Sequence, residues 1–166
     1  DHLNLKKNSN VLEIASGSGR DSEIIADRLC NDGSLFLYDI SPKMTKRAKN
    51  KLKEKDCKIS YSLGDASILP FKNSMFDAVY SFGGLGEFDN IKKSLKEMVR
   101  VCKSGGKIVV GDESMPVWLR DTYFAKVLTE TNKQFLEDLP LKNIPIEARK
   151  VRVQWVIGGV FYLIDF

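Results

Sequence analysis

The chain has 166 residues, 43% of them hydrophobic, and a formal net charge of +4 at pH 7. A chain of this length and apolar content can form one domain with a buried core, which excludes a disordered tail and a fibrous protein. The densest basic run, Lys43–Lys55, has apolar residues at helical spacing, which favours a solvated helix face over a nucleic-acid-binding patch.

The elements predicted first alternate between strand and helix. Val11–Ile14 is a short apolar run typical of a buried strand, and the small residues Ala15–Gly19 form a turn after it. A helix is predicted over Asp21–Cys30 and ends at Asn31–Gly33, and a second strand follows at Ser34–Asp39. The residues predicted to face inward from this helix are Ile24, Ile25 and Leu29.

The middle of the chain continues this alternation. Ser41-Pro42 begins a helix, because serine can cap free backbone N–H groups and proline fits the first helical position. Strands are predicted at Ile59–Leu63, near an edge of the sheet, and at Phe76–Phe82. A second amphipathic helix ends at Gly105-Gly106, and a fifth strand follows at Ile108–Val110. The predicted buried faces are Met44, Ala48 and Leu52 in the first helix, and Ile91, Leu95, Met98, Val99 and Cys102 in the second.

The pattern changes after Glu113. A helix is predicted at about Val117–Thr131, and an irregular stretch with prolines follows it. Two apolar runs, Val151–Ile157 and Val160–Phe166, are joined by Gly158-Gly159, which is typical of a β-hairpin. Right-handed crossovers make the preceding strands parallel. The predicted fold class is therefore α/β: a Rossmann-like, mostly parallel seven-stranded sheet with helices on both faces and an antiparallel strand in the C-terminal hairpin.

Cysteine usage and hydropathy bear on the compartment. Cys30, Cys57 and Cys102 form neither a CxxC pair nor a cluster typical of a zinc site, so no metal is expected. Their odd number, in a sequence without a recognisable targeting peptide, predicts a cytoplasmic protein. The longest apolar stretch, Trp155–Ile164, is far shorter than the ~20 residues of a membrane span, so none is expected.

The segment Glu13–Gly19 joins the first strand to the first helix. Its small residues let backbone approach a ligand closely and leave N–H groups at the helix start available. A nicotinamide-binding loop favours glycine where this chain has Ser22, and a phosphate-binding loop needs a lysine that is absent here. Because Glu13 precedes the loop, a cationic ligand is a better fit than a polyphosphate.

Two further acids follow the next two strands. Asp39 ends the second strand, where a carboxylate can accept both hydroxyls of a ribose, and Asp65 follows the third, where it can accept from the amine of adenine. Alternatively, Asp39 could cap the next helix and Asp65 could be a turn residue. Ligands in open α/β sheets bind at the carboxyl ends of the strands, so acids at three consecutive strand ends favour a nucleoside site.

Six segments occur in an order that is typical of one enzyme family. They are Val11–Gly19, Tyr38–Met44, Gly64–Ala66, Leu69–Phe71, Phe76–Val79 and Leu95–Gly106. With them the chain resembles the class I S-adenosylmethionine-dependent methyltransferases over nearly its whole length, and within these the ubiquinone/menaquinone-biosynthesis (type 11) small-molecule subgroup. It departs from the family at Ala15, where glycine is commonest, and at Ser104, where proline is usual.

The resemblance implies that the chain binds S-adenosylmethionine and that S-adenosylhomocysteine is the product. Glu13 and the loop after it would hold the methionine moiety, and Asp39 the ribose. Residues after the second and third strands would contact the adenine, and those ending the fourth would lie beside the sulfonium. The implied cofactor-binding residues are Glu13, Ala15, Ser16, Gly17, Ser18, Gly19, Asp39, Ile40, Met44, Asp65, Ala66, Ser81, Phe82 and Gly83.

The implied reaction is in-line transfer of a methyl group to a small-molecule acceptor. The fourth strand ends in Tyr80–Gly83 rather than the Asn/Asp-Pro-Pro-Tyr/Phe run of enzymes that methylate bases or glutamine, so no nucleic-acid partner is expected. A base is needed only where the acceptor must lose a proton. Candidates are Glu87, Asp112 and Glu113, although a solvated loop carboxylate is the commoner explanation for each. His2, the only histidine, is expected to be an exposed terminal residue.

Other interpretations stay open. The chain could bind the cofactor without independent turnover, which is favoured if the acceptor-covering N-terminal segment is missing, as the short stretch before Val11 leads us to expect. A nicotinamide oxidoreductase is disfavoured by Ser22 and by the terminal hairpin, and aminopropyl transfer by the lack of a second acidic pair after the fourth strand. Residues 1–166 are expected to form one S-adenosylmethionine-binding domain. Its oligomeric state and its acceptor are not predicted.

Overall fold

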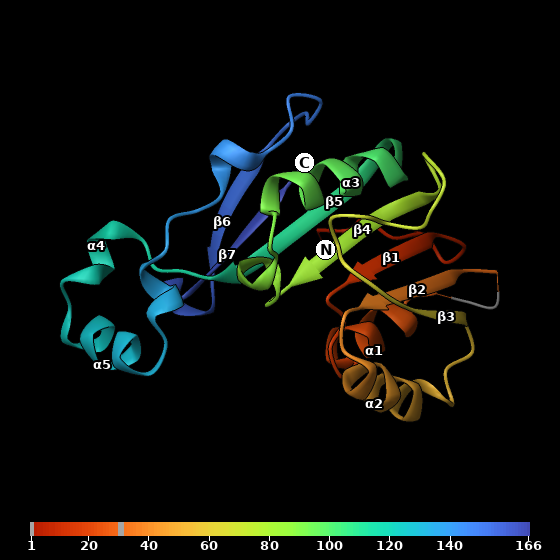
Figure 1. Ribbon diagram of the computed structural model, residues 1–166, viewed down its shortest axis with the longest axis horizontal. Helices are drawn as coiled ribbons and strands as arrows, with labels where there is room; N and C mark the ends of the chain where they lie inside the picture. The colour runs from red at the N-terminus through yellow and green to blue at the C-terminus, as the bar shows by residue number, and fades with distance from the viewer. Residues whose placement is uncertain (1, 30–31) are drawn as a thin grey trace.

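Seven strands form one sheet in the described part of the chain, which is residues 2–29 and 32–166 of a computed structural model (Figure 1). The strand order is β3-β2-β1-β4-β5-β7-β6. Neighbours among β1 to β5 are parallel, and β7 is antiparallel to both β5 and β6, which confirms the predicted sheet and C-terminal hairpin. The strands are β1 (Asn10–Ile14), β2 (Ser34–Asp39), β3 (Lys58–Leu63), β4 (Phe76–Phe82), β5 (Cys102–Glu113), β6 (Arg152–Val156) and β7 (Phe161–Asp165).

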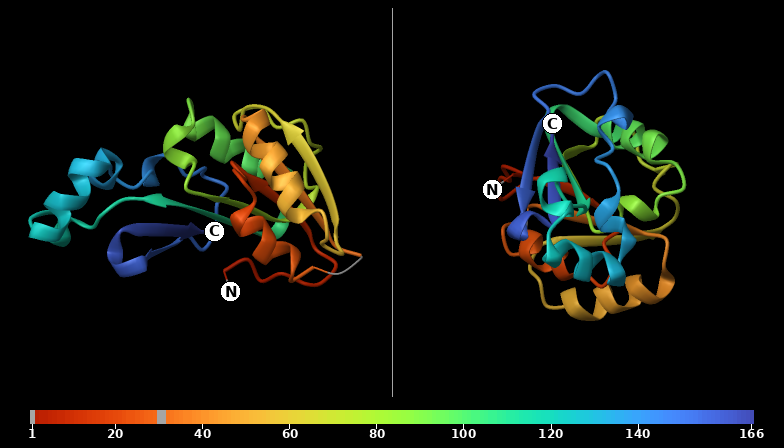
Figure 2. Two further views of the ribbon diagram at one scale, coloured as in Figure 1. Left: turned by 90° about the horizontal axis from the view of Figure 1, so that it is seen from below. Right: turned by 90° about the vertical axis from the view of Figure 1, so that its left-hand side faces the viewer.

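Helices cover both faces of the sheet. α1 and α2 lie on one face and α3 on the other, whereas α4 and α5 lie beyond the carboxyl end of β5 (Figures 1 and 2). Within the described ranges, none of these helices is long and apolar enough to cross a membrane. The helices are α1 (Arg20–Ala26), α2 (Pro42–Leu52), α3 (Ile91–Val101), α4 (Val117–Arg120) and α5 (Tyr123–Thr131), with short 3₁₀ turns η1 (Leu85–Glu87), η2 (Lys133–Leu136), η3 (Leu141–Asn143) and η4 (Ile157–Gly159).

The alternation of side chains along β1 explains the two apolar layers. Val11 packs with the residues of α1 and α2, and its neighbour Leu12 packs with those of α3, because successive side chains of a strand point to opposite faces. β1 is therefore buried on both sides, as its continuous apolar run predicts. The layer under α1 and α2 contains Val11, Leu35, Leu37, Ala78, Ile25, Leu29, Ala48 and Leu52. The layer under α3 contains Leu12, Ile14, Val79, Ile108, Leu95 and Met98.

The start of α2 is capped as the sequence predicts. Ser41 Oγ accepts a hydrogen bond from the Met44 backbone N–H at 3.3 Å, and Pro42 occupies the first helical position. This cap satisfies one of the N–H groups that an α-helix leaves unpaired and contributes about 1 kcal/mol. It fixes where the chain turns after β2, which places Asp39 and Ile40 at the edge of the sheet.

The first helix is shorter than predicted. α1 ends at Ala26, after which Arg28 N–H bonds to Ile25 O and Leu29 N–H to Ala26 O, a three-residue spacing that tightens the last turn. Ile24 was expected to face inward but is 59% exposed, because only the opposite side of α1 meets α2 and the sheet. Cys30 and Asn31, the predicted end of this helix, lie outside the described residues.

Two other predicted boundaries are wrong. The predicted helix Val117–Thr131 is divided into α4 and α5, because Thr122 has an extended backbone and its side chain caps the second helix at the Ala125 N–H, 3.2 Å away. Likewise α3 ends at Val101 rather than at Gly105-Gly106. Cys102 is already in β5, and the glycines lie in an irregularity before the β4–β5 ladder resumes.

Candidate functional site

A cavity of about 380 Å³ opens at the carboxyl ends of β1, β2, β3 and β4, and we call it the edge cavity. Parallel strands bring these ends together, which is where open α/β sheets bind ligands. It is lined by the predicted site residues Ala15, Gly17, Asp39, Ile40, Met44, Asp65, Ala66 and Gly83, and by Glu87. Lining residues that the predicted set lacks are Ile14, Tyr38, Gly64, Gly84, Phe88 and Asp89.

The loop after β1 forms one wall of the edge cavity. Gly17 has a φ of +54°, and a Cβ at this position would meet no atom within 4 Å, so the loop presents bare backbone to open space. Ala15 also has a positive φ of +54°, which is unfavourable for a residue with a side chain. Gly84 makes this arrangement possible, because a Cβ there would lie only 2.5 Å from Ala15 Cβ.

Asp39 links this loop to the next helix. Its Oδ2 accepts from the Gly17 backbone N–H at 2.7 Å, and its Oδ1 accepts from the Ser41 backbone N–H at 2.8 Å. The residue is 7% exposed and still lines the cavity. The capping role considered from the sequence is therefore present. Each carboxylate oxygen can accept more than one hydrogen bond, so a ligand hydroxyl can still bind here.

The segment after β3 closes the cavity at its other end. Asp65 Oδ1 accepts from the Ser67 backbone N–H at 2.7 Å, a bond that lowers the pKa of this exposed carboxyl. Tyr38 donates its hydroxyl to the backbone carbonyls of this turn, at 3.4 Å to Asp65 O and 3.3 Å to Ile68 O. A Cβ at Gly64 would overlap the Tyr38 hydroxyl, which is the physical reason for glycine at this position.

Glu13 lies beneath the loop rather than in the cavity wall. It is 3% exposed, and its Oε2 has no hydrogen-bond partner among the described residues. Burial raises its pKa to about 8, and the charges of Asp21 and Asp39 add to the rise. In β1 it pairs in register with Tyr80 of β4, so both side chains point to the face that α1 covers.

The other predicted cofactor-binding residues do not line the edge cavity. Ser16 accepts from Gly19 N–H at 3.0 Å through its backbone carbonyl, and Gly19 packs against Ala48 of α2, so both shape the loop that also contains Ser18. Ser81 is buried in β4, and its Oγ has no partner in the described part of the chain. Phe82 is turned toward β7, where it stacks on Phe161 with ring centroids 5.4 Å apart.

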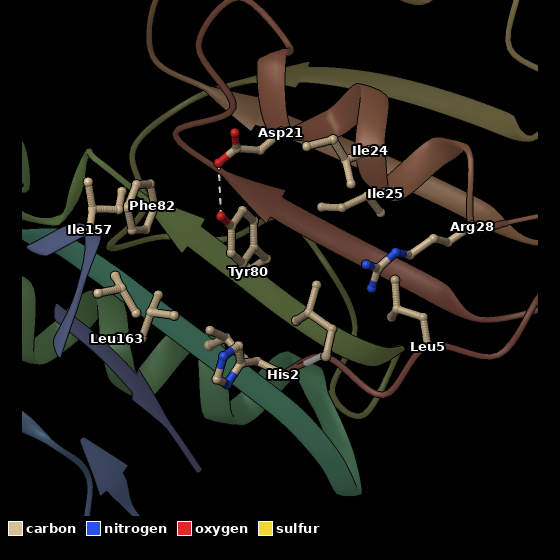
Figure 3. A pocket seen from close by; sticks show the side chains of 13 residues that line it. His2, Leu5, Asp21, Ile24, Ile25, Arg28, Tyr80, Phe82, Ile157 and Leu163 are labelled. Carbon is tan, nitrogen blue, oxygen red and sulfur yellow. Dashed lines mark hydrogen bonds between the residues drawn. The ribbon is translucent and has the colours of Figure 1, made fainter. Parts of the chain in front are cut away.

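A second cavity, of about 410 Å³, lies on the α1 face of β4, β5 and β7, and we call it the apolar cavity (Figure 3). Its lining residues are mainly hydrophobic and include Phe82. Its polar end is a hydrogen bond from the Tyr80 hydroxyl to Asp21 Oδ2 at 2.8 Å, drawn as a dashed line in Figure 3. The exposed side chains of Ile24 and Ile157 stand at its rim.

A third cavity, of about 380 Å³, contains two of the predicted base candidates, and we call it the acidic cavity. Asp112 is 2% exposed, and its two oxygens accept from the Gly86 N–H at 2.7 Å and the Glu113 N–H at 2.9 Å. Hydrogen bonding to Asp112, together with burial, raises the pKa of Glu113 to about 7. The loop Gly83–Glu87 contributes residues to both the edge cavity and the acidic cavity and so separates them.

The sequence is similar to known methyltransferases. A family model described as a methyltransferase domain matches residues 11–106. A ubiquinone/menaquinone biosynthesis C-methyltransferase of Francisella tularensis subsp. novicida is 31% identical over 141 residues, which is 81% of this chain and 56% of that protein. A demethylmenaquinone methyltransferase of Renibacterium salmoninarum is 39% identical over 108 residues, which is 65% of this chain and 43% of that protein. The chain thus spans about half the length of these relatives.

Solved structures share the fold at lower identity. An S-adenosylmethionine-dependent methyltransferase from Aquifex aeolicus superposes with a TM-score of 0.68 at 18% identity, over 98% of this chain and 84% of that one. A phosphoethanolamine N-methyltransferase 2 from Haemonchus contortus, in complex with S-adenosyl-L-methionine, gives a TM-score of 0.71 at 20% identity. The superposition covers 92% of this chain and 36% of that one. At these identities the likeness supports the fold alone.

Proposed function

Because this chain belongs to the class I S-adenosylmethionine-dependent methyltransferases, we propose that it transfers a methyl group from S-adenosylmethionine to a small-molecule acceptor by in-line displacement. The observation that supports this most is the edge cavity, because the family's cofactor is a nucleoside and the acid after each of β2 and β3 lies in its wall. No single feature of the fold would select this ligand, but the set of chemically suited side chains does.

The residues present fit the cofactor. A ribose needs a buried acceptor pair, which Asp39 supplies, and an adenine needs a flat apolar surface, which Ile40 supplies with a side chain that is 75% exposed at the cavity. Gly17 offers bare backbone to the methionine moiety, and Glu13 has an unpaired buried oxygen under the same loop. Asp65 and Met44 would complete the adenine end.

Ser16, Ser18 and Gly19 would then act through the shape of the loop rather than by contact. Of the three residues at the end of β4, Gly83 is in the cavity wall and would lie nearest the reacting methyl group, and Ser81 and Phe82 would support it from β4. The cofactor, when bound, supplies a methyl group that is already activated by a sulfonium. The chain must align the acceptor and exclude water, and alignment alone can contribute several kcal/mol.

We place the acceptor on the side of the acidic cavity. The loop Gly83–Glu87 lines both the edge cavity and the acidic cavity, so an acceptor in the acidic cavity would be one loop away from the cofactor. Of the three base candidates, Glu113 fits best, because its raised pKa lets it take a proton near neutral pH. Asp112 is committed to two backbone N–H groups and would hold Glu113 and Gly86 in place.

The names of the relatives suggest the first acceptor to test. One is a demethylmenaquinone methyltransferase, so the reduced form of a demethylmenaquinone, a dihydroxylated aromatic ring, is our first choice. Methyl transfer to such a ring carbon would break the cofactor's S–CH₃ bond, form a C–C bond and leave the thioether as product. The ring carbon would then lose its proton to Glu113. The segment after β4, Gly83-Gly84-Leu85, also lacks the two prolines expected of an enzyme that methylates the amino group of a nucleic-acid base.

The test is formation of S-adenosylhomocysteine by the purified chain, followed by mass spectrometry, with and without the reduced quinone. Turnover that depends on the acceptor supports the proposal, and a +14 mass shift in the acceptor identifies the product. Cofactor binding without turnover on any member of a panel of phenols, amines and thiols would favour the alternative, a cofactor-binding domain without independent turnover.

A further inference from the structure

Glu13 is a buried acid in an acidic neighbourhood. Its side chain is 3% exposed, and Oε2 makes no hydrogen bond to any described residue. The charged groups that act on it are Asp21 of α1 and Asp39 at the end of β2, both acids. An ionised carboxylate in this position would lack a counter-charge and could draw only on the neutral Ser22 hydroxyl, which is a costly state for a buried acid.

The remaining groups that face Glu13 do not supply the missing charge. From β4, the Tyr80 hydroxyl donates to Asp21 Oδ2, as Figure 3 shows. From α1, the fully buried Ser22 hydroxyl lies close enough to Glu13 to lower its pKa, but it carries no charge. Arg20 of α1 is engaged with Asp21, 3.2 Å away, and its side chain is 77% exposed. From β2, the register partner Leu37 is apolar.

We infer that the Glu13 carboxyl is neutral in the ligand-free chain at neutral pH and becomes ionised when a ligand with a cationic amine binds above it, so that binding releases one proton. The inference rests on the proposed function, because the amine is that of the cofactor's methionine moiety. The proton leaves the Glu13 carboxyl for the solvent, and no other bond is formed or broken. The incoming cation supplies the counter-charge that the fold omits.

The loop explains how a ligand can reach a carboxyl that lines no cavity. Gly17 presents open space on the cavity side, and the loop Ala15–Gly19 follows directly on the end of β1, where Glu13 lies. Ala15 and Gly17 already have positive φ angles, so the loop is held by contacts rather than by backbone preference. For an amine to reach the unpaired oxygen, the loop must shift while Gly17 keeps its hydrogen bond to Asp39.

The inference predicts a pH dependence of affinity. Below about pH 8, where Glu13 is protonated, each rise of one pH unit increases affinity by up to about tenfold, because one proton is lost on binding. Above that pH the dependence from Glu13 disappears. A structural acid that stays neutral in the complex would give no such slope.

Isothermal titration calorimetry with S-adenosylhomocysteine tests this. Titrations at pH 6.5 in phosphate and in imidazole, whose ionisation enthalpies differ, give the number of protons released. We expect nearly one for the unaltered chain and nearly none for Glu13→Gln, which keeps the size of the side chain. Any titration of the ligand's own amine is common to both proteins and cancels in their difference. Glu23→Gln, at a 44% exposed carboxylate of the neighbouring helix α1, is the matched control and should release as many protons as the unaltered chain.

A second measurement needs no variant that could misfold. The ¹³C carboxyl resonance of Glu13 should move from its protonated to its ionised position when ligand saturates the unaltered chain at pH 6.5. Binding without proton release and without this change overturns the inference and leaves the proposed function standing. Absence of binding between pH 5.5 and 8.5 overturns both. Proton release with S-adenosylmethionine but not with S-adenosylhomocysteine would assign the effect to the sulfonium and contradict the role of the amine.

Discussion

The backbone N–H of Gly17 donates a 2.7 Å hydrogen bond to Asp39 Oδ2, so the loop after β1 is tied to the end of β2. The second oxygen of the same carboxylate holds the first turn of α2 through the Ser41 N–H. Hydrogen bonds to an ionised acceptor are about twice as strong as neutral ones. One buried acid therefore fixes two sides of the edge cavity before any ligand arrives.

Replacing Asp39 should weaken cofactor binding and the fold together. In Asp39→Asn, the amide NH₂ faces one of the two backbone donors, so either Gly17 or Ser41 loses its partner. We expect affinity for S-adenosylhomocysteine to fall at least about tenfold, and the free energy of unfolding to fall by about 1–3 kcal/mol. Calorimetry and urea unfolding measure both. Asp27→Asn, at an exposed acid bound to Lys55 Nζ, is the control and should change neither by much. Unchanged affinity in Asp39→Asn would contradict the assigned role.

The contact between Ala15 and Gly84 predicts a rescue. In Gly84→Ala the new Cβ would lie 2.5 Å from Ala15 Cβ, and we expect a loss of about 1–3 kcal/mol in the free energy of unfolding. Ala15→Gly alone should be neutral or stabilising, since it removes a side chain from a residue at φ +54°. The double variant should recover most of the loss, a coupling that a thermodynamic cycle measures directly. Additive changes in the free energy of unfolding would show that the two positions are not coupled and would contradict the predicted steric contact.

Burial of Glu13 predicts that the ligand-free chain loses stability as pH rises. Its pKa is raised to about 8 in the folded chain from about 4.5 unfolded, so between these values the folded state holds a proton that the unfolded state has lost. The free energy of unfolding therefore falls from about pH 4.5 to about pH 8 and is level, with respect to Glu13, above that. Glu13→Gln should remove this decline and be more stable than the unaltered chain at pH 8. Parallel curves for the two proteins would rule out the raised pKa.

Glu113 predicts a pH profile of turnover. As a proton acceptor it must be ionised, so the rate with an acidic acceptor should rise with pH through about 7. Glu113→Gln should lower kcat by about 10²–10⁴-fold and abolish this rise, while leaving the KM for the cofactor unchanged. Glu147→Gln, at an exposed carboxylate outside the acidic cavity, is the control. A retained rise in Glu113→Gln would move the proton-accepting role elsewhere.

The sheet could be predicted because its information is local. Continuous apolar runs mark strands buried on both faces, and Ser41-Pro42 marks a helix start, so strand positions and the order of elements follow from short segments. Boundaries depended on partners far away in the chain. α3 ends early because Cys102 pairs with Phe76, and Ile24 is exposed because the sheet beside α1 is left open.

The edge cavity was predictable to the extent that the strand ends were. Asp39, Asp65 and the loop after β1 follow strands that the pattern identifies, so their meeting at one edge follows from the topology. The role of Gly84 could not be predicted from the strand pattern. It depends on the close approach of Ala15, which follows a different strand, β1. The burial of Glu13 beneath the loop, and the turn of Phe82 toward Phe161, also depend on three-dimensional packing.

Titration of the purified chain with S-adenosylhomocysteine, S-adenosylmethionine and NAD tests the central claim most directly. The account predicts one site with affinity in about the micromolar range for both adenosyl ligands, lost in Asp39→Ala and retained in Asp27→Asn. Binding of NAD in preference to the adenosyl ligands would contradict the assignment of the edge cavity to this cofactor.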